Sequence, residues 1–292
     1  MNATPAQQKS SVTKMSNGSI KRILVALDAS ELNNSMLLAA TSLASRLNAQ
    51  LEALFVEDIN LLRLAELPIA REVSASSRQV RQLTPADMER QLRTQVERLR
   101  RFVQSAAQQA NLKVEFRVLR GQIASELNLA VTQMDLLIIG KNTQALRRSE
   151  KLGRITQAVL LSSNCNVLLL QHGAAVERPV AVLFSGSEAS QRTLLLGIQL
   201  AQGDHEQLSV FYPPLPDEKQ QALQEQVTAL TSQFGIAPRH IVLAEINAQN
   251  ILAALGTCQG RLLLLETNPD LLPDDQLQSL LRQSNIPVIL VR

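Results

Sequence analysis

The sequence predicts an α/β protein built from two doubly wound, Rossmann-like domains, each with a five-stranded parallel sheet. Short apolar runs bounded by turn residues alternate with amphipathic helical patterns, which is typical of βαβ units. The pattern restarts halfway along the 292 residues, a length that suits about two domains. Six Phe, one Tyr and no Trp leave the interior to Leu, Ile, Val and Ala, as in parallel sheets buried between helices.

One unit, residues 134–171, organises the first predicted domain. An apolar run at 136–139 stops at Gly140, and a polar, basic loop follows. A helical pattern then begins at Gly153, and a second apolar run at 167–170 closes the unit. This is a strand, loop, helix and strand crossover, whose loop leaves the carboxyl end of a buried parallel strand. Ligands of open α/β sheets sit at that edge, so we expect any phosphate site here.

The other elements of the first domain follow from the same periodicities. A helical stripe runs from Met36 to Leu47 at 3.6-residue spacing. The segment 58–86 is longer than an ordinary βα loop, and it carries a leucine-rich helical turn that ends at Pro68. Pro85 lies near the first turn of a long helix. The predicted strands are 22–28, 49–57, 114–119 and the two of the organising unit, and the later helices are 85–110 and 123–132.

The second half repeats this order after a short polar linker at 172–178. Its predicted strands are 180–184, 207–212, 241–244, 262–265 and 287–291, with a helix at 217–234. Residues 1–20 are polar and lack an apolar core segment, so they indicate a disordered tail and no signal peptide. We therefore expect a first domain at 21–172 and a second at 178–292.

Three pairs of segments indicate an internal duplication. Residues 27–31 (LDASE) align with 184–188 (FSGSE), and 135–143 (DLLIIGKNT) align with 261–269 (RLLLLETNP). The strand-five segments 162–170 (SSNCNVLLL) and 282–291 (RQSNIPVILV) align as well. Each half should therefore be one copy of the same unit.

These residues resemble the universal stress protein family in its tandem, two-domain form, over about residues 20–292. In that family strand one ends in an Asp, as Asp28 does here, and strand four enters a loop of pattern G-x-x-G, nine residues, then G-Ser/Thr. The resemblance implies the same five-stranded sheet, of the HUP type. It also implies that the two fifth strands pair, here 167–170 with 288–291, to form an intramolecular pseudo-dimer.

The resemblance further implies ATP, or another adenine nucleotide, as a ligand of the first domain. Asp28, Gly140 and Gly153 match the family's pattern, whereas Thr143 replaces its second loop glycine and Arg154 its Ser/Thr. A left-handed Thr143 would cost about 1–2 kcal/mol, and Arg154 could grip phosphate with its guanidinium. The candidate nucleotide-binding set is Asp28, Ala29, Gly140, Lys141, Thr143, Gly153, Arg154 and Ile155.

Each candidate also has a purely structural explanation. Asp28 and Glu31 have near capping-box spacing, so Asp28 could simply cap the following helix. Gly140 could serve a tight turn, and Gly153 close helix packing. The basic residues of the loop could form a solvated surface. The sequence leaves these alternatives open.

The second domain lacks the nucleotide-loop pattern of the family. Glu266 stands where Gly140 stands, Ser185 stands where Asp28 stands, and no glycine loop follows. A carboxylate about 4 Å from a phosphate costs about 4 kcal/mol at an effective dielectric near 20. We therefore expect this degenerate domain to pack against the first without binding ATP.

Charge and composition narrow the function class. Residues 1–176 hold 22 basic and 14 acidic residues, whereas 177–292 hold seven and twelve, so the first half suits an anion better. Scarce aromatics make nucleic acid an unlikely partner. Two isolated cysteines predict no metal site or disulfide, and no apolar run reaches the 18 or more residues of a membrane span. No side-chain arrangement predicts catalysis.

We therefore expect a cytoplasmic, non-catalytic regulatory protein of stress response that binds no membrane. A protein-interaction scaffold that has lost nucleotide binding is the alternative, and a homodimer or a protein partner is compatible with either.

Overall fold

A computed structural model describes residues 20–28, 33–73, 79–141, 156, 158–160, 163–171, 173–202 and 208–292. The expected tail lies outside this part of the chain except for Ile20. That residue is 1% exposed and joins the core, because it directly precedes the first strand. The predicted helix that begins at Gly153 is described only at 156 and 158–160, which are helical.

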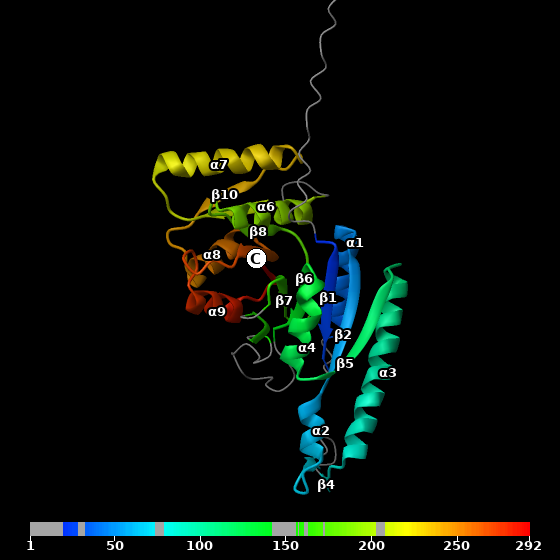
Figure 1. Ribbon diagram of the computed structural model, residues 1–292. Helices are drawn as coiled ribbons and strands as arrows, with labels where there is room; N and C mark the ends of the chain where they lie inside the picture. The colour runs from blue at the N-terminus through cyan, green and yellow to red at the C-terminus, as the bar shows by residue number, and fades with distance from the viewer. Residues whose placement is uncertain are drawn as a thin grey trace, which may run out of the picture.

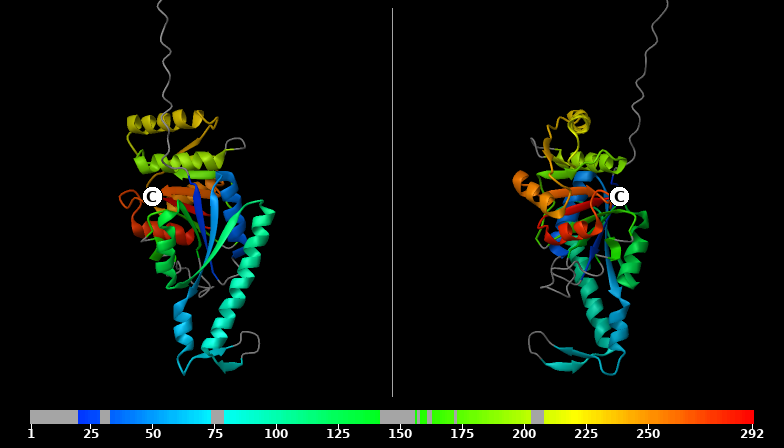
Figure 2. Two further views of the ribbon diagram at one scale, coloured as in Figure 1. Left: turned by 45° about the vertical axis from the view of Figure 1, so that its right-hand side comes forward. Right: turned by 90° about the vertical axis from the view of Figure 1, so that its left-hand side faces the viewer.

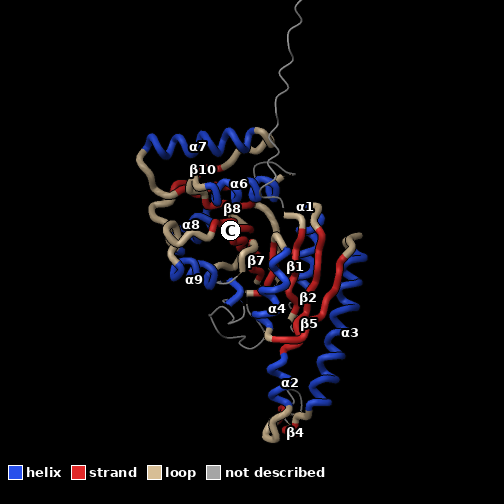
Figure 3. Tube along the Cα trace, in the orientation of Figure 1, coloured by secondary structure: helices blue, strands red, loops and turns tan. Residues whose placement is uncertain are grey.

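The main strands form one sheet in the order β10-β9-β8-β11-β12-β7-β6-β1-β2-β5 (Figures 1 and 3). The first half contributes β1 (Arg22–Leu27), β2 (Gln50–Asp58), β5 (Val114–Gly121), β6 (Leu136–Gly140) and β7 (Asn166–Leu170). The second contributes β8 (Val180–Leu183), β9 (Leu208–Tyr212), β10 (Arg239–Val242), β11 (Leu262–Glu266) and β12 (Val288–Val291). Within each half the neighbouring strands are parallel, so the predicted pair of doubly wound sheets is confirmed.

Helices cover both faces of the sheet (Figure 1). One face carries α1 (Asn33–Leu47), α3 (Pro85–Gln109), α6 (Glu188–Ala201) and α7 (Asp217–Ser232), and the other carries α4 (Ile123–Ala130), α8 (Ala248–Cys258) and α9 (Asp274–Gln283). A 3₁₀ turn, η1 (Val131–Gln133), continues α4. Alternate strand residues enter opposite layers: Leu136 and Ile138 pack under α1, whereas Leu137 and Ile139 pack on the α4 side. Both apolar layers continue through the two halves.

The two halves meet at their fifth strands. β12 pairs with β7 in antiparallel fashion, with Val288 opposite Leu169 and Leu290 opposite Val167. This is the one antiparallel junction in the ten-stranded sheet, and it confirms the predicted pseudo-dimer. Because each strand covers the edge of the other, neither half exposes its β7 or β12 edge.

Cationic side chains bind helix carboxyl ends across this junction. The guanidinium of Arg46, at the end of α1, donates to the carbonyls of Val176 and Leu200, the latter in the last turn of α6. The ammonium of Lys141 donates to the carbonyls of Arg282 and Ser284, at 2.5 and 2.9 Å, at the end of α9. Such cations satisfy carbonyls that lack intrahelical partners and complement the helix dipole.

The segment after β2 forms an arm that projects beyond the carboxyl edge of the sheet (Figures 1 and 2). It contains α2 (Ile59–Ala65) and a ribbon of β3 (Arg71–Val73) and β4 (Val80–Gln82), and the first half of α3 forms its other side. A small separate core holds it together, made of Ala65, Ala70, Leu83, Met88 and Leu92. The predicted leucine-rich helical turn is confirmed, and none of the described residues of the arm lines the pocket described below.

Several element bounds differ from the predicted ones. β10 begins at Arg239 and ends at Val242, whereas the apolar pattern predicted 241–244. The reason is that Arg239 and His240 pair with β9, and the His240 Nδ1 lies 2.7 Å from the Tyr212 hydroxyl. Polar residues therefore occupy half of an edge strand, where alternation of hydropathy is weak.

The junction contact of Lys141 is testable. Lys141→Met should lower the free energy of unfolding by about 1–3 kcal/mol, because the α9 carbonyls lose a charged donor. Urea unfolding followed by circular dichroism measures the change. Lys113→Met, at an exposed position, is the matched control. Equal unfolding midpoints for the two variants would contradict the assigned contact.

Candidate functional site

A pocket opens at the carboxyl ends of β1 and β6, where the order of the first five strands reverses direction. This is the switch point at which doubly wound sheets bind their ligands. The enclosed volume of the pocket is about 70 Å³. Its described lining is Ala26, Leu27, Asp28, Met36, Leu54, Val56, Ile123, Leu127, Ile139, Gly140, Thr156 and Val159.

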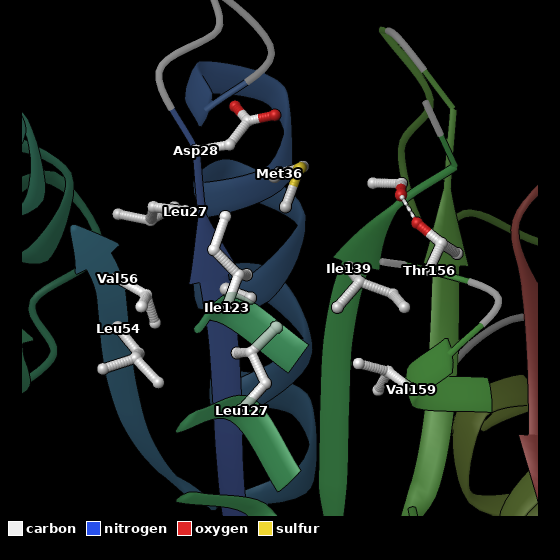
Figure 4. A pocket seen from close by; sticks show the side chains of 12 residues that line it. Leu27, Asp28, Met36, Leu54, Val56, Ile123, Leu127, Ile139, Thr156 and Val159 are labelled. Carbon is white, nitrogen blue, oxygen red and sulfur yellow. Dashed lines mark hydrogen bonds between the residues drawn. The ribbon is translucent and has the colours of Figure 1, made fainter. Parts of the chain in front are cut away.

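Most of the pocket wall is apolar. Leu54 and Val56 project from β2, and Ile123 and Leu127 project from α4 beside them (Figure 4). Ile139 continues the wall on β6. Such a wall suits a flat or aliphatic ligand body, whose burial is worth about 25 cal/mol per Å².

Asp28 brings a carboxylate to this apolar pocket. It directly follows β1, and Figure 4 shows its side chain on the same side of the pocket as Met36. A carboxylate at this position can accept hydrogen bonds from ligand hydroxyl groups. The alternative capping-box interpretation involves Glu31, which lies outside the described residues.

Gly140 ends β6 at the pocket. Its carbonyl accepts a hydrogen bond of 3.1 Å from the Thr156 hydroxyl (Figure 4). Its backbone does not have positive φ, so a left-handed turn does not explain the glycine. Gly140 and Asp28 line the same pocket, one from the end of β6 and the other from the end of β1.

Lys141 makes its described hydrogen bonds away from the pocket. Its ammonium binds the carboxyl end of α9, and burial lowers the pKa of this lysine from its usual value. It does not appear in the described pocket wall. Its described contacts are therefore structural. A role for Lys141 in nucleotide binding stays a prediction.

The structure brings Asp28 and Gly140 together, as predicted. Ala29, Thr143, Gly153, Arg154 and Ile155 lie outside the described residues.

Thr156 and Val159 are pocket residues that the sequence did not single out. Thr156 is only 2% exposed, and its bond to the Gly140 carbonyl ties the helix that follows the loop to the end of β6. The signal for them was their place in the helical pattern that the sequence predicts from Gly153 onward.

The second half fills the equivalent position with a carboxylate. Glu266, at the end of β11, is 2% exposed. Its two oxygens accept hydrogen bonds from the hydroxyls of Ser185 and Ser187, both at 2.6 Å. The Ser187 hydroxyl also accepts from the Ser190 amide at 2.9 Å, which caps α6. The buried carboxylate therefore stands at the position equivalent to Gly140, since β11 pairs with β8 as β6 pairs with β1.

No described group of His, Cys, Asp or Glu residues could hold a metal ion. Within the described part of the chain, no helix is both long and apolar enough to cross a bilayer.

The fold and the pocket define a Rossmann-like α/β protein with a pocket at its switch point. A model of the universal stress protein family matches residues 19–171, more than half of the chain, and the protein belongs to that family. No curated protein matches the sequence.

Three solved structures share the fold across both halves. A universal stress protein from Archaeoglobus fulgidus aligns with a TM-score of 0.68 at 16% identity, over 92% of this chain and 95% of its own. A functionally unknown protein from Pseudomonas aeruginosa PAO1 aligns with a TM-score of 0.56 at 12% identity, over 94% of this chain and 92% of its own. A putative universal stress protein from another Pseudomonas aeruginosa strain aligns with a TM-score of 0.53 at 14% identity, over 94% of this chain and 93% of its own. At these identities the likeness concerns the fold alone.

The buried Glu266 contacts predict a stability effect. Glu266→Ala should lower the free energy of unfolding by about 1–3 kcal/mol, because two serine hydroxyls lose their acceptor. Urea denaturation measures the free energy of unfolding of Glu266→Ala and of the control variant, Glu188→Ala. Glu188 forms only an exposed ion pair with Arg192, so its loss should cost about 0–1 kcal/mol. A Glu266 variant as stable as the control would show that the carboxylate is dispensable.

Proposed function

We propose that the chain is a non-catalytic regulatory protein of stress response, which binds ATP or another adenine nucleotide in the pocket of its first half. The observation that carries this proposal is the contrast at one position: Gly140 lines an open pocket in the first half, whereas the buried Glu266 stands at the equivalent position in the second. Membership of the universal stress protein family supports it. In this proposal the chain is a cytoplasmic, tandem form of that family.

The described wall suits the adenosine part of such a ligand. The base would lie among Leu54, Val56 and Ile123, where apolar side chains exclude water. The Asp28 carboxylate would accept from ribose hydroxyls, as acidic residues at Rossmann switch points do. The phosphates would extend toward the loop that follows Gly140, where Gly153 and Arg154 belong to the proposed site. No metal ligand from the protein is part of the proposal.

The second half has a structural role in this proposal. Its fifth strand covers the edge of β7, and its α9 accepts the Lys141 ammonium next to Gly140. It thereby holds β6 and β7, the strands on either side of the phosphate loop. A nucleotide-dependent change in that loop would reach the second half through these contacts.

Calorimetry with ATP tests the proposed site. Wild type should bind one ATP per chain, and Gly140→Val should abolish the binding because it adds a branched side chain at a position that lines the pocket. Gly256→Val is the matched control, since a Cβ at Gly256 meets no atom within 4 Å and lies on α8 of the second half. Absence of heat with ATP, ADP and AMP for wild type would remove the nucleotide proposal.

Substitution of Asp28 tests the ribose contact separately. Asp28→Ala should weaken ATP binding by about tenfold, equivalent to the loss of about 1.4 kcal/mol of hydrogen bonding. The same loss should not occur for 2′,3′-dideoxy-ATP, which lacks the hydroxyls. If Asp28→Ala weakened both ligands equally, the carboxylate would have another role. Hydrolysis of ATP by the wild type, lost in Asp28→Asn, would contradict the non-catalytic assignment.

The projecting arm favours a second candidate function, that of a protein-interaction scaffold. Its surface exposes Leu61, Leu64, Ile69, Val73 and Val80, with Ile69 83% exposed. Exposed apolar groups of this kind are typical of protein contact sites. In this alternative a homodimer or another protein covers the arm, and Gly140→Val leaves that association unchanged. Sedimentation of wild type and Ile69→Glu tests it: association weakened by the charge on the arm supports the scaffold, and identical monomers exclude the homodimer.

A further inference from the structure

A second cavity lies at the junction of the two halves. It encloses about 240 Å³ and is separate from the pocket beside Asp28, with which it shares no lining residue. Leu160 of the first half forms part of its wall. The rest comes from α9, the residues between β11 and α9, and the end of β12. A ligand here would contact both halves at once.

Leucine side chains dominate the apolar part of this cavity. Leu272 and Leu281 are 3% and 2% exposed, and Leu277, Leu290 and Leu160 complete the surface. No aromatic ring belongs to the described wall, so stacking with a planar ring is not provided. Flexible aliphatic chains pack well against such branched side chains, and each buried methylene contributes about 0.8 kcal/mol. The cavity body therefore suits an aliphatic chain.

Arg292 brings a cation to the same cavity. One of its terminal nitrogens donates to the carbonyl of Leu160, and its Nε is buried without a hydrogen-bond partner. Burial lowers the pKa of this guanidinium, and no described ion pair supplies it with a carboxylate. Because the guanidinium lines the cavity, it favours an anionic acceptor there, above all a planar carboxylate.

Asp274, at the start of α9, also lines the cavity. Its negative charge opposes ligands that carry several charges, such as nucleotides and phosphate esters. A single carboxylate can approach Arg292 while the uncharged remainder of the ligand lies toward Asp274. The neutral Thr267 and Asn268 complete this part of the wall.

We propose that the junction cavity binds a short aliphatic monocarboxylate, with its carboxylate at Arg292 and its chain among the leucines. The residues involved are distinct from the proposed nucleotide site, so the two proposals can fail independently. Octanoate has the matching chemistry and serves as the probe, and 1-octanol offers the same chain without the charge.

Calorimetry on the full chain tests this site. Wild type should bind octanoate, and Arg292→Gln should weaken that binding by at least about tenfold while binding of 1-octanol stays unchanged. Arg282→Gln is the matched control, since Arg282 is exposed on α9 and absent from the cavity wall. Leu277→Phe, which fills the cavity from a partly buried position, should abolish binding of both probes.

Circular dichroism confirms that each variant is folded before titration, and Gly140→Val should bind octanoate as wild type does. Two results would overturn the proposal: no octanoate binding by wild type, or octanoate affinity that neither Arg292→Gln nor Leu277→Phe reduces.

Discussion

The antiparallel pairing of β7 with β12 is the constraint on which the rest of the structure depends. Each half alone would end in a buried-type apolar strand with an unpaired edge, which promotes association. Pairing joins the two sheets, so that one apolar layer runs beneath α1 and α6 and another beneath α4 and α9. Arg46 and Lys141 then supply donors to helix carbonyls across the same junction. Backbone pairing, core packing and helix capping therefore hold the halves in one orientation.

Within this symmetric frame, a single position separates the two halves. At the end of the fourth strand, a glycine lines an open pocket in one half, and a buried carboxylate with two serine partners stands at the equivalent position in the other. Two serine hydroxyls satisfy the carboxylate, so the second half gains internal hydrogen bonds where the first keeps a pocket. Duplication of one unit thus produces one open and one filled site, and the filled copy serves as the structural partner.

Periodicity in the sequence predicted the strands and the order of the helices, because apolar spacing depends on which face is buried. The pairing partner of β7 was implied by the resemblance to the universal stress protein family. Periodicity also brought Asp28 and Gly140 to one sheet edge, since both follow parallel strands. Periodicity could not predict where the Lys141 side chain points, because the carbonyls that it binds belong to Arg282 and Ser284, 141 and 143 residues away. Nor could it predict the β3–β4 ribbon, whose strands of three residues are too short to show a period. Thr156 escaped notice because its contact is with a backbone carbonyl, which no residue pattern reveals.

The central claim is that, of the two equivalent switch points, only the one in the first half retains a nucleotide site. Hydrogen–deuterium exchange of the full chain, with and without saturating ATP, tests it most directly because it reports on both halves in one experiment. The account predicts slower exchange in peptides that contain Asp28, Gly140 and Thr156, and no change in those that contain Ser185 and Glu266. Protection of the Ser185 and Glu266 peptides, with none around Gly140, would contradict it.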